Sequence, residues 1–248
     1  MKRRRHRAVA STLALLESLS LPIAAQETAD AGAPSPKYLE EVAPHTARNS
    51  PATRNAALSP GACRAELRRR HLGTRNARVP TPGVALPLRL SSPLDGVRFV
   101  VPGGKSPYGV LDCRLLLTLH DLTKILKRHS VVEVRIDNFY RPRAHLPGRK
   151  KPSQHALGLA ADIVSFTLDN GRSLLVERDW RGALGGAPCG PGSEPQEPTE
   201  ETVALRNLVC DIARAGIFHH LLTPNFDAAH ESHLHADIKR GDRYGGVR

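Results

Sequence analysis

Two stretches of sequence decide the fold and the chemistry that this chain can support. They are Ser153-Gln154-His155-Ala156-Leu157-Gly158-Leu159-Ala160-Ala161-Asp162 and His230-Glu231-Ser232-His233-Leu234-His235. The first holds a histidine and an aspartate on either side of a glycine, and the second holds three histidines within six residues. Imidazole nitrogens and carboxylate oxygens are ligands that hold catalytic zinc in proteins. The two stretches together therefore predict a metal site.

The seven-residue spacing between His155 and Asp162 predicts a change of chain direction between them. Within one strand, an odd separation would place the two side chains on opposite faces of the sheet. Within one helix they would share a face but lie about 10 Å apart, whereas ligands lie only about 2 Å from a shared ion. A loop that turns at Gly158 and enters a strand near Ala160 removes the difficulty, since glycine permits the turn.

The histidines near the C-terminus are expected on one face of a strand. Residues i and i+2 of a strand point to the same side, with Cα atoms roughly 6.5 Å apart, so His233 and His235 would address one cavity. One of them could bind a metal ion while the other reaches water or a substrate. The alternative is an ordinary surface histidine pair, which the presence of His230 in the same stretch makes less favoured.

The remaining pattern predicts an α+β domain with a mainly antiparallel sheet and flanking helices. One helix should begin at Pro60, capped by Ser59, and a second should occupy residues 113–129, where leucines recur at helical spacing. Asn170-Gly171 predicts a hairpin. A further helix is expected at Glu200–Ala215, and strands at Val97–Val101, Val131–Asp137, Ala160–Leu168, Ser173–Glu177, Ile217–Leu222 and His233–Lys239.

The N-terminal part predicts an exported protein with one domain. Residues 1–25 combine a basic start, an apolar run and a small-residue cleavage site, as in a secretory signal peptide. Residues 26–58 are rich in Ala, Pro, Thr and Ser and are expected to form a disordered linker, which leaves residues 59–248 as the domain. No other segment has the ~18 apolar residues of a membrane helix, so no transmembrane helix is expected in the mature chain.

The chain is strongly basic, with a formal net charge of +12. Residues 1–25 carry five of the Lys and Arg residues and one Glu, so their removal would leave +8. This charge favours an anionic polymer or surface as the neighbour, and a merely solvated arginine-rich surface is the alternative. Nucleic acid is disfavoured as a partner, because export separates the protein from it and aromatic residues make up only 4% of the chain.

The chain has four cysteines, at Cys63, Cys113, Cys189 and Cys210. An even number behind a signal peptide predicts two disulfides, for which three pairings are possible. Pairing Cys63 with Cys113 and Cys189 with Cys210 keeps both bridges local in the chain and is the preferred arrangement. None of the spacings is Cys-x-x-Cys, so a cysteine-ligated zinc site is a weaker alternative.

The sequence from about Cys63 to Tyr244 resembles the extensin-like C-terminal domain family of bacteria, within the D-Ala-D-Ala metallopeptidase and murein endopeptidase superfamily. The resemblance implies a hedgehog/D-Ala-D-Ala-peptidase-like fold. It rests on Ser153-x-His155-x-x-Gly158-x-Ala160-x-Asp162, Phe166-Thr167-Leu168-Asp169-Asn170-Gly171, Asp179-Trp180 and His230-x-x-His233-x-His235-x-Asp237.

The resemblance also implies roles for the residues of the two stretches. His233 would be the catalytic histidine beside the metal, and His230 matches a further active-site histidine. Ser153 would support a ligand without touching the ion itself. The implied zinc ligands are His155, Asp162 and His235.

Two residues near the implied ligands are further candidates for catalysis. Arg141 matches an arginine that these peptidases place over the substrate, and an arginine at a strand end suits a carboxylate or a developing oxyanion. A surface ion pair is the alternative for Arg141. Glu231 stands where an aspartate is more usual and is a candidate general base, ranked after His233. The family often has Cys-Arg where this chain has Tyr140-Arg141, which bears on the disulfides more than on the metal site.

Together these observations predict a monomeric, secreted or periplasmic zinc metallopeptidase. Its expected reaction is cleavage of amide bonds in the stem peptides or cross-links of peptidoglycan, an anionic cell-wall polymer. The alternative is a non-catalytic, metal-containing protein that binds or scaffolds the cell wall. Basic nucleic-acid binding is a third, disfavoured interpretation.

Overall fold

The computed structural model describes residues 36–42, 45–46, 49–91, 93–242 and 244–248. All of them belong to one compact unit, Ser35–Arg248. The expected signal peptide, residues 1–25, and the first part of the expected linker lie outside the described residues. In the part that the structure describes, no helix is long and apolar enough to cross a membrane.

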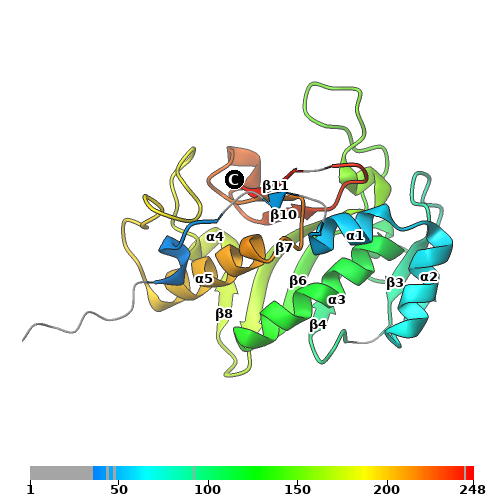
Figure 1. Cartoon of the computed structure of the whole chain (residues 1–248), viewed down its shortest axis with the longest axis horizontal. Coiled ribbons are helices and arrows are strands. Elements are labelled where there is room, and N and C mark those ends of the chain that lie inside the picture. Colours follow the sequence, from blue (N-terminus) through cyan, green and yellow to red (C-terminus); the bar gives the residue numbers. More distant parts are fainter. Residues whose placement is uncertain (1–35, 43–44, 47–48, 92, 243) are drawn as a thin grey trace, which may run out of the picture. The chain divides into compact units, whose positions relative to one another are not determined.

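The described unit is an α+β structure built on a mixed sheet of eight strands (Figure 1). Most neighbouring strands are antiparallel, and two pairs, β4 with β6 and β11 with β9, are parallel. The order across the sheet is β1 (His45–Thr46), β11 (Tyr244–Val247), β9 (His220–Leu222), β10 (Leu234–Asp237), β7 (Ala160–Leu168), β6 (Val131–Asn138) and β4 (Arg98–Val100), with β8 (Ser173–Leu175) also paired to β7.

Strand β7 lies at the centre of the sheet and has two partners on one edge. Residues 162–168 of β7 pair with β6 on one edge, and β10 and β8 share the opposite edge. Residues 160–163 pair with β10, and residues 165–167 pair with β8. Asp162 and Ile163 of β7 are therefore held between β6 and β10, next to the candidate site.

Helices α3 (Cys113–Arg128) and α5 (Glu200–Arg214) cover one face of this sheet (Figure 1). Both begin as expected from their sequence. Asp112 accepts a hydrogen bond from the first turn of α3, and Thr199 does the same for α5, which satisfies N–H groups that the helix leaves unpaired. The leucines and isoleucines of α3 and α5 are buried, and they form the main core with the inner side chains of the sheet.

A second, three-stranded antiparallel sheet was not expected from the sequence. Its order is β2 (Thr74–Asn76), β3 (Pro87–Leu90) and β5 (Leu111–Asp112). Helix α2 (Pro60–Arg69) precedes it and is capped by Ser59, as the Ser-Pro pattern predicts. These short strands have no clear alternation, so their sequence carries little signal of pairing.

The structure departs from the linker expected over residues 26–58. The described part of that range contains a 3-10 turn, η1 (Lys37–Leu39), strand β1 and helix α1 (Pro51–Ala57). Tyr38, Ala52 and Ala56 are buried. The linker prediction was wrong because small side chains are typical of disordered segments. Alanines, however, also allow a short helix such as α1 to pack closely against α3.

Smaller departures concern the ends of strands. Strand β8 stops at Leu175, where residues Val176–Asp179 form the short helix α4, although a strand was expected through Glu177. Strand β9 begins at His220 instead of Ile217. Strand β10 begins at Leu234, so His233 lies just before the strand that was expected to contain it.

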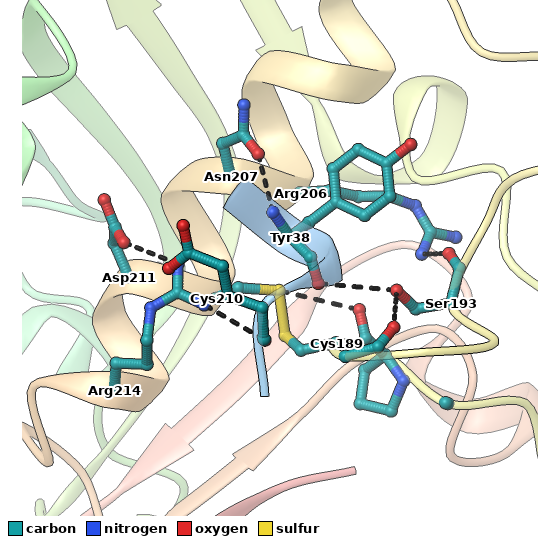
Figure 2. Close-up of a disulfide and its surroundings, with 12 residues drawn as sticks. Tyr38, Cys189, Ser193, Arg206, Asn207, Cys210, Asp211 and Arg214 are labelled. Atoms are coloured by element: carbon teal, nitrogen blue, oxygen red, sulfur yellow. Dashed lines mark hydrogen bonds and ion pairs between the residues drawn. A yellow bond between two sulfur atoms is a disulfide. The ribbon is translucent and has the colours of Figure 1, made fainter. Parts of the chain in front are cut away.

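Both disulfides have the preferred pairing, Cys63 with Cys113 and Cys189 with Cys210. The first joins α2 to the start of α3. The second joins the loop before α5 to α5 itself (Figure 2). Near this bridge, the backbone of Tyr38 accepts hydrogen bonds from the loop and donates one to Asn207 of α5. The second disulfide therefore lies where the N-terminal segment, the loop and α5 meet.

Non-reducing peptide mapping of the mature protein should recover these two pairs and no others. Each bridge lowers the conformational entropy of the unfolded chain, and each should therefore stabilise the fold by about 2–4 kcal/mol. Thermal unfolding with and without reductant measures the combined effect. Free thiols in protein purified without reductant would contradict both bridges.

Candidate functional site

The first ligand candidate, His155, is placed by a single turn and a glycine. His155 lies in η3 (Gln154–Leu157), where Ser153 Oγ accepts a hydrogen bond from the His155 backbone N–H at 3.3 Å. Gly158 ends the turn with φ 64°, in the left-handed region that glycine adopts without strain. The chain then enters β7 at Ala160, and Asp162 follows two residues later. The change of direction expected between the two ligand candidates is confirmed.

Strand pairing brings the third candidate to the same point. His235 of β10 is the direct register partner of Asp162 of β7. His155 Nε2 lies 3.0 Å from Asp162 Oδ1 and 3.0 Å from His235 Nδ1, and the last two atoms are 3.2 Å apart. Three ligands about 2.0–2.1 Å from a tetrahedral ion would be about 3.3–3.4 Å apart. The triangle of ligand atoms is therefore only slightly smaller than the one that a zinc ion requires.

Hydrogen bonds on the far side of each imidazole determine which nitrogen is free. His155 Nδ1 lies 3.1 Å from the carbonyl oxygen of Phe139, which can only accept, so Nδ1 carries the proton. His235 Nε2 lies 3.1 Å from Asp237 Oδ2, and the carboxylate likewise takes its N–H. When both rings are neutral, the remaining nitrogens, His155 Nε2 and His235 Nδ1, therefore present lone pairs to each other and to Asp162.

The carboxylate of Asp162, the remaining ligand candidate, is also oriented by a hydrogen bond. Asn138 Nδ2 donates to Asp162 Oδ2 at 2.8 Å, which leaves Oδ1 directed at the two imidazoles. His155 is fully buried, and Asp162 and His235 are buried with exposed fractions of 3% and 9%. Three converging lone pairs with little water around them repel one another unless a cation lies between them. The residues present therefore fit a metal ion such as zinc.

The charges around the site follow from the same contacts. Burial opposes ionisation of Asp162, but the close interactions of its carboxylate with His155 and His235 outweigh this effect and hold its pKa well below the usual range. Burial also opposes a charge on His235, whereas the hydrogen bonds to Asp162 and Asp237 raise the pKa of His235 to about 9. In the absence of a metal, a proton on His235 thus supplies the positive charge that the cluster needs.

His233 and His230 lie beside the three ligand candidates without joining them. His233 Nε2 is 3.6 Å from Asp162 Oδ1, and burial lowers the pKa of His233. The His230 ring centre is 5.2 Å from that of His233 and 5.9 Å from that of His235. Asp227 holds His230 through Nδ1 at 2.6 Å. His233 and His235 line one cavity, as expected, and His230 lines it too, but His233 precedes the strand that was expected to contain it.

Of the other predicted site residues, Arg141 and Ser153 lie at the site and Glu231 does not. Arg141 lies at the cavity with Nη2 3.8 Å from Asp162 Oδ2, and its side chain is 49% exposed. Ser153 is buried and supports the backbone of His155, as expected for a residue beyond the ligands. Glu231 is exposed and does not line the cavity. The structure therefore does not place Glu231 beside the candidate ligands, where a general base would be needed.

A cavity of about 910 Å³ opens beside the candidate ligands. One wall is the segment 141–154, which leads into η3, and the opposite wall is the segment 220–233, which leads into β10. His235 and His233 face this cavity, and Arg141 lies on its wall. The space is large enough for a peptide segment, since ligand pockets commonly measure about 300–1,000 Å³.

Sequence reasoning assigned no role to the residues that orient the ligands. Asp237 accepts from His235 and also lies 2.9 Å from His220 Nδ1, and Asn138 fixes Asp162. Hydrogen bonds to Asp237 from His220 and His235 hold its pKa down at about 2, despite the opposing effect of burial. The alternating pattern His233-x-His235-x-Asp237 could have indicated that Asp237 lies beside His235, because residues two apart in a strand share a face. Asn138 gave no such signal, as it lies on a different strand.

The wall that carries His230 depends on a close contact between Gly182 and Asn225. Asn225 accepts from Trp180 Nε1 at 2.7 Å and donates to the carbonyl oxygens of Gly186 and Ala187. A Cβ atom at Gly182 would lie 1.8 Å from Asn225 Oδ1. Asn225 is followed directly by the residues that line the cavity, so this contact sets where the wall begins.

Gly182→Ala should lower the free energy of unfolding by about 1–3 kcal/mol, because the buried Asn225 side chain must move and lose hydrogen bonds. Chemical denaturation at constant pH measures the change. Gly103→Ala is the matched control, since a Cβ there meets nothing within 4 Å, and it should change stability by less than about 0.5 kcal/mol. Equal stability of the two variants would refute this account of the wall.

Comparison with known proteins defines the family of the chain. Residues 117–247 match the family described as Extensin-like protein C-terminus. This match covers more than half of the chain, so the protein belongs to that family. The matched region contains all three candidate ligands and every strand of the large sheet except β4 and β1. No curated protein and no solved structure matches the chain.

Proposed function

We propose that the protein is a zinc-dependent peptidase of the cell envelope that hydrolyses amide bonds in the stem peptides or cross-links of peptidoglycan. The proposal includes a monomeric, periplasmic or secreted enzyme with the fold of the D-Ala-D-Ala metallopeptidases. The observation that carries it is the convergence of three buried lone pairs from His155, Asp162 and His235 beside a cavity of about 910 Å³. Two disulfides and the absence of a membrane-spanning helix among the described residues are compatible with export.

The chemistry divides between the ion and the residues around it. A zinc ion held by two histidines and a carboxylate supplies a Lewis acid and makes water a nucleophile near neutral pH. His233 lies close enough to the ligands to exchange a proton with the reacting groups. Because burial lowers its pKa, His233 is neutral at neutral pH and can accept a proton, then return it to the departing amine.

Arg141 is the group that can bind negative charge on the substrate. Its guanidinium is half-exposed at the cavity and lies 3.8 Å from Oδ2 of Asp162. In that place it can stabilise the charge that develops on the attacked carbonyl oxygen. On the opposite wall, Asp227 takes the Nδ1–H of His230, which leaves Nε2 of the neutral ring as a hydrogen-bond acceptor for the substrate.

The competing proposal is a metal-containing protein that binds the wall without cutting it. The basic character of the chain supports attachment to an anionic polymer equally well with or without turnover. Digestion of purified sacculi with the zinc-loaded mature protein separates the two proposals. Mass spectrometry of the released peptides identifies the bond that is cut, and sacculi that release no peptide would favour the binding protein.

Chelation and salt should affect the protein in opposite ways. A chelator should abolish cleavage of sacculi and leave binding largely intact, because binding depends on exposed charges. Raising the salt concentration should weaken binding, since exposed charges are screened over ~8 Å at physiological ionic strength. Cleavage of a short soluble muropeptide should respond far less to salt. Cleavage that survives complete removal of metal would overturn the zinc mechanism.

A further inference from the structure

The segment that forms one wall of the cavity is a projecting arm with its own internal structure. Residues 143–152 fold back on themselves, with His145 bridged to Pro152 and the Leu146 N–H bonded to the Lys151 carbonyl oxygen. Gly148 turns the tip with φ 64°. Figure 1 shows this arm as the light-green loop that projects beyond β6 and β7.

The base of the arm is tied to the first ligand candidate. The Arg141 N–H bonds to the His155 carbonyl oxygen at 3.1 Å, and the Ser153 N–H bonds to the Ala144 carbonyl oxygen at 2.9 Å. Ser153 in turn caps the turn that carries His155. A peptide substrate bound along the arm would therefore extend directly to the candidate metal ligands.

The arm carries exposed cations, and none of them is paired with a carboxylate among the described residues. These cations are Arg143, Arg149, Lys150 and Lys151. Elsewhere many exposed basic residues have acidic partners, as in the pairs Arg98 with Glu133 and Arg172 with Glu201. The cavity wall includes two aspartates, but His230 engages Asp227 while His220 and His235 engage Asp237. The charge of the arm is therefore not neutralised by the two aspartates that line the cavity.

We propose that this arm is a substrate-binding element whose Arg149 and Lys151 bind carboxylate groups of the peptidoglycan peptides beside the bond that is cut. Both residues line the cavity, and the apolar side chains of Leu146 and Phe226 lie on its two walls. A guanidinium binds a carboxylate through two parallel hydrogen bonds, and an ammonium adds a point charge. This inference rests on the proposed function, because it takes the substrate to be the acidic stem peptide.

The test measures binding and not cleavage, so it can fail or succeed independently of turnover. Zinc-loaded protein carrying His233→Ala binds purified sacculi without cutting them, and co-sedimentation gives its affinity. In that background, Arg149→Ala with Lys151→Ala is compared with Arg68→Ala with Lys124→Ala. The control pair is exposed, lies on α2 and α3, and removes the same charge. Zinc content and melting temperature establish that each variant is folded.

The arm variant should bind sacculi about 5- to 30-fold more weakly, while the control should change affinity less than about 2-fold. Sacculi whose carboxylates have been converted to amides should bind the parent protein as weakly as untreated sacculi bind the arm variant. Equal losses in both variants would overturn the proposal in favour of general charge attraction. Binding that survives amidation but is lost when phosphate polymers are removed would overturn the assignment to carboxylates.

Discussion

Replacing His155, Asp162 or His235 by Ala should each remove the bound zinc. Each of these side chains supplies one of the three ligand atoms, which lie 3.0–3.2 Å apart, and two remaining ligands hold the ion weakly. Loss of a residue that merely orients a ligand costs about 10–100-fold in metal affinity, so loss of a ligand itself should cost more than about 100-fold. Elemental analysis after dialysis against a weak chelator measures the zinc that remains.

His129→Ala provides the control for this loss of metal. His129 is also a partly buried histidine paired with an aspartate, Asp211 at 2.7 Å, but it does not line the cavity. This variant should keep about one zinc ion per chain. Full occupancy in all three ligand variants, measured beside this control, would show that the metal site has been placed wrongly.

His233→Ala should keep the zinc and lose most of the turnover. The nearest ligand oxygen is 3.6 Å from His233 Nε2, and the three ligand atoms do not need this ring in order to hold the ion. Loss of an acid–base group should lower kcat by a factor of about 10²–10⁴. Zinc content and the rate of muropeptide hydrolysis, measured on the same preparation, separate the two effects.

Two further variants show which role His233 has. His230→Ala should keep both zinc and part of the turnover, because Asp227 holds His230 on the wall, where its Nδ1 is engaged. His233→Gln restores a hydrogen-bonding group of similar reach but cannot carry a proton at neutral pH, so it should remain slow. Loss of zinc from His233→Ala as complete as that from His235→Ala would mean that His233 is a ligand.

The sequence predicted the site more completely than it predicted the fold around it. His155, Gly158 and Asp162 were informative because their spacing excluded one straight element, and only a turn followed by a strand remained. The pairing of β10 with β7 could not be read in this way, since the partner of a strand depends on contacts distant in the chain. For the same reason Asn138 and the hydrogen bond from His220 to Asp237 were not foreseen.

The N-terminal segment is a part of the fold that the sequence did not predict. Residues 49–58 have a composition typical of a linker, yet Ala52 and Ala56 are buried against the core. Asn55 donates to Thr118 and Asp121 of α3, two contacts that composition cannot reveal. Packing that relies on small side chains and single polar contacts leaves little periodic signal in a helix of seven residues.

The ligand atoms come from places far apart in the chain, since 80 residues separate His155 from His235. The unfolded polypeptide therefore has no preformed site, and the zinc ion that we propose would bind only the folded state. By mass action, each tenfold rise in free zinc above the dissociation constant adds about 1.4 kcal/mol to the free energy of unfolding. For the exported zinc peptidase that we propose, the supply of metal outside the cell would then govern resistance to heat and proteolysis as well as catalysis.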